Sequence, residues 1–328
     1  MFLQKQILPG AGPEGDFALH CMMGAAPCSF KLPQRKIRAM ATHPDLMRPS
    51  VPLPADLPQQ VARALAEDVG AGDLTAALIP AERIGRAAVI TREPAVVCGI
   101  PYVNATFEAV DARIRVEWRV AEGDAVAADR LLFALEGPAR ALLTAERTAL
   151  NFLQLLSGTA TAAHSYALLL EGTKCRLLDT RKTLPGLRTA QKYAVRVGGG
   201  HNHRMGLFDG ILIKENHIMA AGSIASAVAQ ARRGGARVPV EVEVENLSEL
   251  QQAIAAGADI AMLDDFSLQT LREAVAHNAA APRPLKLEAA GGITSSTIHD
   301  VAATGVDYIS VGSITKHVRA IDVSMRFE

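Results

Sequence analysis

Charged and imidazole side chains concentrate in one stretch of the sequence, residues 179–217. This stretch holds seven Lys or Arg residues and three His residues against three acidic ones. The basic residues are Arg181, Lys182, Arg188, Lys192, Arg196, Arg204 and Lys214, and the histidines are His201, His203 and His217. The whole chain has a formal net charge of +0, so this is a local concentration of positive charge. Such a cluster between apolar strands is typical of a site for a small polyanion, a carboxylate or a phosphate. The alternative is a solvated surface patch.

Six short apolar segments, each followed by a helical pattern, predict a parallel sheet in the second half of the chain. They begin about 20 to 35 residues apart, as βαβ crossovers require. The segments are 175–180, 210–214, 238–244, 259–264, 285–290 and 306–312. Six units are fewer than the eight of a closed barrel. We therefore expect an α/β fold with an open, incomplete β/α barrel.

Polar residues and glycines stand where these predicted strands end. In chain order they are Arg181 and Lys182, Lys214, Glu243 and Glu245, Asp264 and Asp265, Ala290-Gly291-Gly292, and Gly312-Ser313. In a β/α barrel the carboxyl ends of the strands converge on the face that carries the active site. Glycines at such turns let backbone N–H groups approach a phosphate. We expect cations, carboxylates and two glycine turns to share one mouth.

Two kinds of charge in one mouth suggest two ligands. Lys, Arg and His side chains suit an anionic organic substrate, which guanidinium groups hold by paired hydrogen bonds. Glu243 and Asp264 suit sugar hydroxyls or Mg²⁺, which takes one or two protein carboxylates and shares its other positions with water and phosphates. An anionic acceptor, a phosphorylated sugar and Mg²⁺ together point to phosphoribosyl transfer.

The first half of the chain is expected to form two further parts. Residues 1–48 have no helical or strand period and are interpreted as a flexible N-terminal extension, with Met40 as an alternative start to Met1. A targeting peptide is the other interpretation of this segment. Residues 49–150 predict a smaller α+β domain, and residues 151–313 the barrel. We expect the tail, residues 314–328, to pack on the smaller domain.

A long helix, predicted over 139–170, joins these two domains and is apolar all round in its first half, as expected at a domain or subunit junction. Arg147 stands inside that apolar pattern. An arginine there is costly to bury unless it meets an anion. Its other interpretations are a pair with Glu146 or an exposed side chain.

Composition excludes several classes of function. The balanced charge gives no reason to expect a nucleic-acid partner, and apolar runs are interrupted too early for a membrane-spanning helix. The four cysteines lie far apart without a CxxC pair, which favours a reducing compartment such as the cytoplasm.

Two segments suggest a metal site more weakly. Residues 201–203 (HNH) could be half of a zinc site. The acidic turn at 67–75 could be a calcium loop, for which a structural turn is the alternative.

The stretch at 179–217 closely resembles the signature of quinolinate phosphoribosyltransferases, also named carboxylating nicotinate-nucleotide pyrophosphorylases. The resemblance extends in order through EDVGAGDLT, ERTALNFLQLLSGTAT, VEVEVEN, AMLDDFS, LEAAGGI and VDYISVGSIT, covering about residues 60 to 320. It implies the reaction of quinolinate with phosphoribosyl pyrophosphate (PRPP), giving nicotinate mononucleotide, CO₂ and pyrophosphate in NAD synthesis. It also implies Mg²⁺ and a homodimer. A larger assembly is compatible with it.

The resemblance also implies roles for individual residues. Arg147 would reach the quinolinate site of the neighbouring subunit, and Arg181, His203 and Arg204 would hold the dicarboxylate. Lys182 and Lys214 would act at the reacting centre, with Glu243 and Asp264 on the ribose hydroxyls and Mg²⁺. The remaining implied substrate-binding residues are Thr180, Ala290, Gly291, Gly292, Val311, Gly312 and Ser313, around the 5-phosphate.

Two positions depart from the family pattern. Ala290 replaces a serine before the glycine pair, which removes a hydroxyl contact but leaves the backbone N–H groups, and Asp265 stands where Asn is common.

The sequence is also compatible with two other functions: a related transferase with another carboxylated acceptor, and a non-catalytic phosphate-binding barrel. Glu243 and Asp264 argue against the second, because a pure anion sensor has no use for carboxylates.

Overall fold

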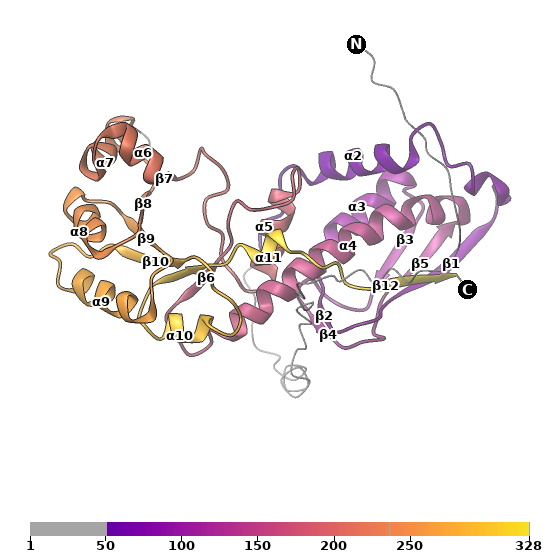
Figure 1. The fold of residues 1–328 in the computed structure, drawn as a ribbon. Helices are drawn as coiled ribbons and strands as arrows, with labels where there is room; N and C mark the ends of the chain where they lie inside the picture. Colours follow the sequence, from indigo (N-terminus) through magenta and orange to yellow (C-terminus); the bar gives the residue numbers. More distant parts are fainter. Residues whose placement is uncertain (1–50, 236, 328) are drawn as a thin grey trace, which may run out of the picture.

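The computed structural model describes residues 51–235 and 237–327. The expected N-terminal extension lies outside these residues. Two sheets lie at opposite ends of the molecule, with a long helix running between them (Figure 1). No helix in the described part of the chain is long and apolar enough to cross a bilayer.

The larger sheet consists of six parallel strands in the order β6-β11-β10-β9-β8-β7. They are β6 (Arg176–Leu178), β7 (Ile211–Ile213), β8 (Val240–Val244), β9 (Ile260–Asp264), β10 (Lys286–Ala290) and β11 (Tyr308–Ser310). β6, the first of these strands in the chain, pairs with β11, the last. The two edge strands, β6 and β7, do not pair with each other, so the barrel stays open. The predicted open β/α barrel is confirmed.

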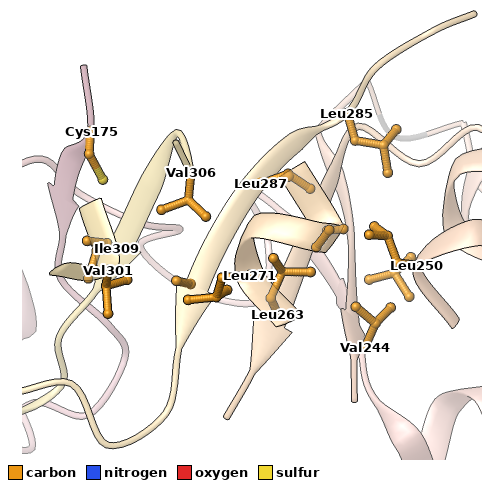
Figure 2. Close-up of a cluster of buried hydrophobic side chains, with 14 of the residues drawn as sticks. Cys175, Val244, Leu250, Leu263, Leu271, Leu285, Leu287, Val301, Val306 and Ile309 are labelled. Carbon is orange, nitrogen blue, oxygen red and sulfur yellow. The ribbon is translucent and has the colours of Figure 1, made fainter. Parts of the chain in front are cut away.

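Helices cover the outside of this sheet. They are α6 (Glu215–Ala221), α7 (Ile224–Arg233), α8 (Leu247–Ala256), α9 (Leu268–Ala279) and α10 (Ile298–Ala302). Helices α5 (Arg188–Val197) and α11 (Ser313–Lys316) lie instead against the long helix α4 (Ala139–Leu168) (Figure 1). Ser223, Asn246 and Ser267 accept backbone N–H bonds at the starts of α7, α8 and α9, so polar caps fix where these helices begin. Their apolar faces pack on the strands in a core that includes Leu250, Leu263 and Leu271 (Figure 2).

The smaller sheet is antiparallel, in the order β12-β1-β5-β3. Its strands are β1 (Ile84–Thr91), β3 (Arg115–Trp118), β5 (Leu131–Pro138) and β12 (Val323–Phe327), and β2 (Ala95–Val96) pairs separately with β4 (Ala125–Val126). Helices α2 (Leu57–Val69) and α3 (Ile100–Val110) and the short η2 (Ala76–Leu78) complete this end. The C-terminal strand β12 pairs with β1, so the chain returns from the barrel to this sheet.

Helix α4 (Ala139–Leu168) contacts both ends of the molecule (Figure 1). Its side chains enter three buried clusters: Leu150 lies with the small sheet, Phe152 with α2, α3 and α5, and Ala163 with the barrel. Burial on several sides explains why its sequence shows no single apolar stripe. A Cβ at Gly158 would lie 2.2 Å from the Arg319 carbonyl oxygen, so glycine lets the returning C-terminal segment cross the helix closely.

The domain boundary expected between residues 150 and 151 lies inside α4, which belongs to both packing units. The sequence interpretation assigned no element to residues 101–112, most of which form α3. Gly99, in a left-handed conformation, precedes this helix, and Pro101 lies in its first turn, where proline is favoured.

Candidate active site

A cavity of about 1080 Å³ opens at the carboxyl ends of the six parallel strands. Every residue predicted for the site from one protomer lines it. They are Thr180, Arg181, Lys182, His203, Arg204, Lys214, Glu243, Asp264, Ala290, Gly291, Gly292, Val311, Gly312 and Ser313. These residues lie up to 133 positions apart in the chain, so the barrel topology brings them together.

Arg147 does not line this cavity. Its side chain is 59% exposed, and its guanidinium lies 3.9 Å from the carboxylate of the preceding residue, Glu146. Among the residues that the structure describes, its ion pair is with this neighbouring acid, which the sequence offered as its alternative partner. Its expected role in a neighbouring subunit's site stays a prediction.

Lys214 and Glu243 form an ion pair across the mouth of the barrel. Lys214 follows β7 and caps α6, and Glu243 stands on the adjacent strand β8, with 2.5 Å between Nζ and Oε2. The lysine side chain is 43% exposed and the glutamate 13%. The two charges are positioned by each other, while the ammonium remains accessible to a ligand.

Both predicted glycine turns line the cavity. Gly291 has φ +88°, and a Cβ there would lie 2.8 Å from the Asp265 backbone nitrogen, so this position requires glycine. Gly312 lies against Lys182, whose carbonyl accepts a hydrogen bond from the Thr315 hydroxyl at 2.8 Å. The lysine backbone and the last turn are thus held together.

A fully buried ion pair anchors the segment that carries His203. Lys192 on α5 and Asp179 after β6 have no exposed side-chain surface, and their Nζ and Oδ1 atoms are 2.5 Å apart. Asp179 also accepts bonds from the His203 backbone N–H and the Asn202 amide, and Lys192 donates to the His203 carbonyl. Burial raises the pKa of Asp179 and lowers that of Lys192, against their mutual attraction.

His203 contacts two buried glutamates that the sequence interpretation did not single out. Its Nε2 lies 2.9 Å from Glu241 Oε2 and 3.5 Å from Glu288 Oε2. Its Nδ1 accepts the Arg204 backbone N–H at 2.7 Å, so the ring proton sits on Nε2 and both ring nitrogens are engaged within the chain. Burial lowers the pKa of His203, but the hydrogen bond and charge of the two carboxylates raise it overall.

Glu241 and Glu288 could have been suspected from their spacing. Glu241 lies two positions before Glu243 on β8, and Glu288 two before Ala290 on β10, so each points to the same barrel face as a predicted site residue. Burial, followed by the Glu241 charge, raises the pKa of Glu288 to about 8.

Arg204 is held in place by its own loop, because its guanidinium donates a hydrogen bond to the Gly210 carbonyl. Burial, followed by the charge of Arg181, lowers the pKa of this guanidinium.

The structure shows the surroundings of the two segments for which the sequence suggested a metal site, the HNH segment and the acidic turn. In the part of the chain that the structure describes, one group of side chains could hold a metal ion, and it contains His203, Glu241 and Glu288 but not His201. In the acidic turn, Asp73 accepts the backbone N–H groups of Thr75 and Ala76 and the Thr144 hydroxyl. That carboxylate stabilises the turn and its junction with α4.

An open β/α barrel whose mouth gathers cations, paired carboxylates and glycine turns defines an enzyme class that handles phosphorylated, anionic substrates. Two family models match this chain: the quinolinate phosphoribosyl transferase C-terminal domain over residues 159–326 and the N-terminal domain over residues 73–157. The chain belongs to the quinolinate phosphoribosyltransferase family.

Relatives of known name agree with the family models. The chain is 42% identical over 260 residues to a probable carboxylating nicotinate-nucleotide pyrophosphorylase of Bacillus subtilis, covering 79% of this chain and 89% of that one. It is 39% identical over 269 residues to the Mycobacterium leprae carboxylating nicotinate-nucleotide pyrophosphorylase, covering 81% and 95%. The solved nicotinate-nucleotide pyrophosphorylase of Francisella tularensis superposes with a TM-score of 0.81 at 48% identity, covering 85% and 98%.

Proposed function

We propose that this chain transfers the phosphoribosyl group of PRPP to the ring nitrogen of quinolinate, with loss of one carboxylate. The products are nicotinate mononucleotide, CO₂ and pyrophosphate, in NAD biosynthesis. The observation that carries this proposal is the single cavity in which Lys182, Lys214, Glu243 and Asp264 meet from four different strand ends. The family membership of the chain supports the same reaction.

The basic residues take the two anionic substrates. Arg181 and Arg204 orient the dicarboxylate, so that its ring nitrogen faces the anomeric carbon and little orientational freedom remains to be lost in the transition state. His203 supports this end of the cavity through the position of Arg204. Lys182 and Lys214 stabilise the charge on the departing pyrophosphate.

The carboxylates act on the sugar. Displacement at the anomeric carbon builds positive charge on the ribose, as in glycoside cleavage, and Glu243 and Asp264 favour that charge. Their oxygens also fit Mg²⁺, which takes few protein ligands, and the exposed Lys214 can leave Glu243 for a phosphate. When bound, Mg²⁺ would supply charge neutralisation to the pyrophosphate. The ring nitrogen is the nucleophile, so no side-chain nucleophile is needed.

The assembly and location of the enzyme belong to the same proposal. A homodimer in which the exposed Arg147 enters the neighbour's cavity gives that arginine an anion to meet. A cytoplasmic location agrees with Cys98 and Cys175, which are both buried free thiols.

Acceptor choice tests the proposed function. The purified chain is incubated with PRPP, Mg²⁺ and either quinolinate or nicotinate, and the nucleotide is identified by mass. We expect nicotinate mononucleotide from quinolinate, and a far slower reaction with nicotinate, since one carboxylate leaves part of the cationic site unmatched. A preference for nicotinate would identify a related transferase, and no nucleotide from either would favour a binding protein.

A further inference from the structure

A buried acid lies in the cavity without a role in the substrate contacts described above. Glu288 on β10 lines the cavity, yet its side chain has no exposed surface. In the described part of the chain neither of its carboxylate oxygens accepts a hydrogen bond of normal geometry, and the His203 Nε2 lies 3.5 Å from its Oε2. A buried ionised carboxylate with so little compensation is strongly disfavoured. Glu288 therefore keeps its proton more readily than an ordinary glutamate.

The groups that face Glu288 act in both directions: Glu241 raises its pKa, while His203 and Ser310 lower it. Glu241, on β8, places a second carboxylate beside it, and two carboxylates in one buried site do not both ionise readily. His203 lies 3.5 Å away but gives its ring proton to Glu241 at 2.9 Å, and Ser310 on β11 adds a neutral hydroxyl. Burial and the Glu241 carboxylate outweigh His203 and the Ser310 hydroxyl, so the pKa of Glu288 is raised to about 8. A dicarboxylate bound nearby would raise its proton affinity further.

The reaction in the proposed function needs a proton at this end of the cavity. When the carboxylate next to the ring nitrogen leaves as CO₂, the electron pair of the broken C–C bond stays on ring carbon 2. The product carries hydrogen at that carbon, so one proton must be delivered there. His203 and Arg204, which lie at the proposed dicarboxylate end, place Glu288 at the same end.

We propose that Glu288 is the general acid that protonates ring carbon 2 after decarboxylation. A C–H bond forms as the Glu288 O–H bond breaks, CO₂ leaves, and the resulting Glu288 carboxylate takes a new proton from solvent before the next turnover. Glu241 is a positioning residue, which keeps the proton on Glu288 by its own negative charge. The inference rests on the proposed function and adds the source of its proton.

Single-turnover kinetics of Glu288→Gln test this role, because glutamine keeps the volume but has no acid proton. A general acid typically contributes about 100-fold or more, so nucleotide lacking the carboxylate should form about 100-fold more slowly, while pyrophosphate release stays within about threefold. The nucleotide that accumulates should retain both carboxylates, since CO₂ that leaves recombines with the unprotonated carbon. Glu288→Asp, which restores an acid at a longer reach, should recover part of the rate.

Controls separate this role from a structural one. Glu273→Gln, on the outer helix α9, should leave both rates unchanged. The quinolinate Kd of Glu288→Gln, measured by calorimetry, should stay within a few-fold of the wild-type value. Equal slowing of pyrophosphate and nucleotide, or wild-type rates in Glu288→Gln, would overturn the proposal. So would a stoichiometric metal ion in the wild type that Glu288→Gln lacks, because Glu288 would then be a ligand. A wild-type chain that forms no nucleotide from quinolinate would instead reject the proposed function itself.

Discussion

Lys192 and Asp179 form an ion pair with no exposed surface, 2.5 Å between Nζ and Oδ1, directly behind the candidate active site. Each partner also bonds the backbone of His203, through its carbonyl and its N–H respectively. The pair therefore joins α5, the end of β6 and the loop that carries His203 and Arg204. If one partner is lost, the other is left as a buried charge without a counter-charge.

Replacing Lys192 by Met should be strongly destabilising. The change leaves Asp179 buried without its counter-charge, which typically costs about 3–5 kcal/mol. Urea unfolding monitored by circular dichroism measures the change in the free energy of unfolding. The matched control is Lys286→Met, because Lys286 forms a pair of similar length (2.6 Å) with Asp307 but is 60% exposed. A surface pair is worth about 0–1 kcal/mol. Comparable losses in both variants would contradict the importance given to the buried pair.

Replacing Lys182 or Lys214 by Ala should reduce turnover. Each variant removes a charge placed to stabilise the departing pyrophosphate, and loss of one such group typically costs about 10²–10³ in kcat. Steady-state formation of nicotinate mononucleotide gives kcat and KM for each variant. Lys174→Ala, at an exposed position outside the cavity, is the control and should match the wild type. A wild-type rate in either cavity variant would remove that lysine from the chemistry.

Arg147→Ala should leave the fold intact and abolish most activity. The side chain is exposed in the single chain and pairs only loosely with Glu146, so its loss should hardly change stability. If it completes a neighbour's site, inactive Arg147→Ala and Lys182→Ala chains should complement each other. In random mixed dimers one site of each heterodimer is intact, which restores about a quarter of wild-type activity.

Complementation of these two variants has a clear negative result. Mixed chains that stay as inactive as the separate variants, while forming heterodimers by mass spectrometry, would show that Arg147 acts elsewhere. Co-expression of the two variants with different affinity tags isolates the heterodimer for this measurement.

Glu288→Gln should stabilise the protein in a pH-dependent way. Below pH 4.5, the ordinary value, the Glu288 carboxyl is protonated in both folded and unfolded chains. Between 4.5 and about 8 the unfolded chain releases this proton more readily, so the wild type loses stability as pH rises, and glutamine avoids that loss. The advantage of the variant should grow across this window, to at least about 1 kcal/mol, and level off above it.

Chemical unfolding at several pH values between 5 and 8.5 measures this difference. Glu273→Gln supplies the reference for replacing an exposed glutamate. An advantage that is the same at every pH would mean that Glu288 titrates normally in the folded protein.

The sequence interpretation located the barrel and most of its mouth because the signals were local. Each of the six parallel strands is a short apolar run between helical patterns, and the residue after each run is fixed in space by the strand that precedes it. The sequence alone therefore predicts that Lys214, Glu243 and Asp264 lie on one rim of the barrel.

The parts that the sequence interpretation missed depend on contacts across the fold. Glu241 and Glu288 stand inside strands. The alternation of a strand shows which face a side chain points to, but it does not show whether that face of the barrel is polar or apolar. The Lys192–Asp179 pair joins residues 13 positions apart through the return of α5 onto β6, and neither residue type indicates full burial. The environment of Arg147 depends on a subunit contact, which no single chain contains.

The most direct test of the central claim is the stoichiometry of products from quinolinate labelled in its 2-carboxylate. With PRPP and Mg²⁺ present, one equivalent each of nicotinate mononucleotide, labelled CO₂ and pyrophosphate should appear per quinolinate consumed. In Asp264→Asn all three should fall together. Pyrophosphate released without labelled CO₂, or no product from quinolinate at all, would contradict the assignment of this cavity to decarboxylating phosphoribosyl transfer.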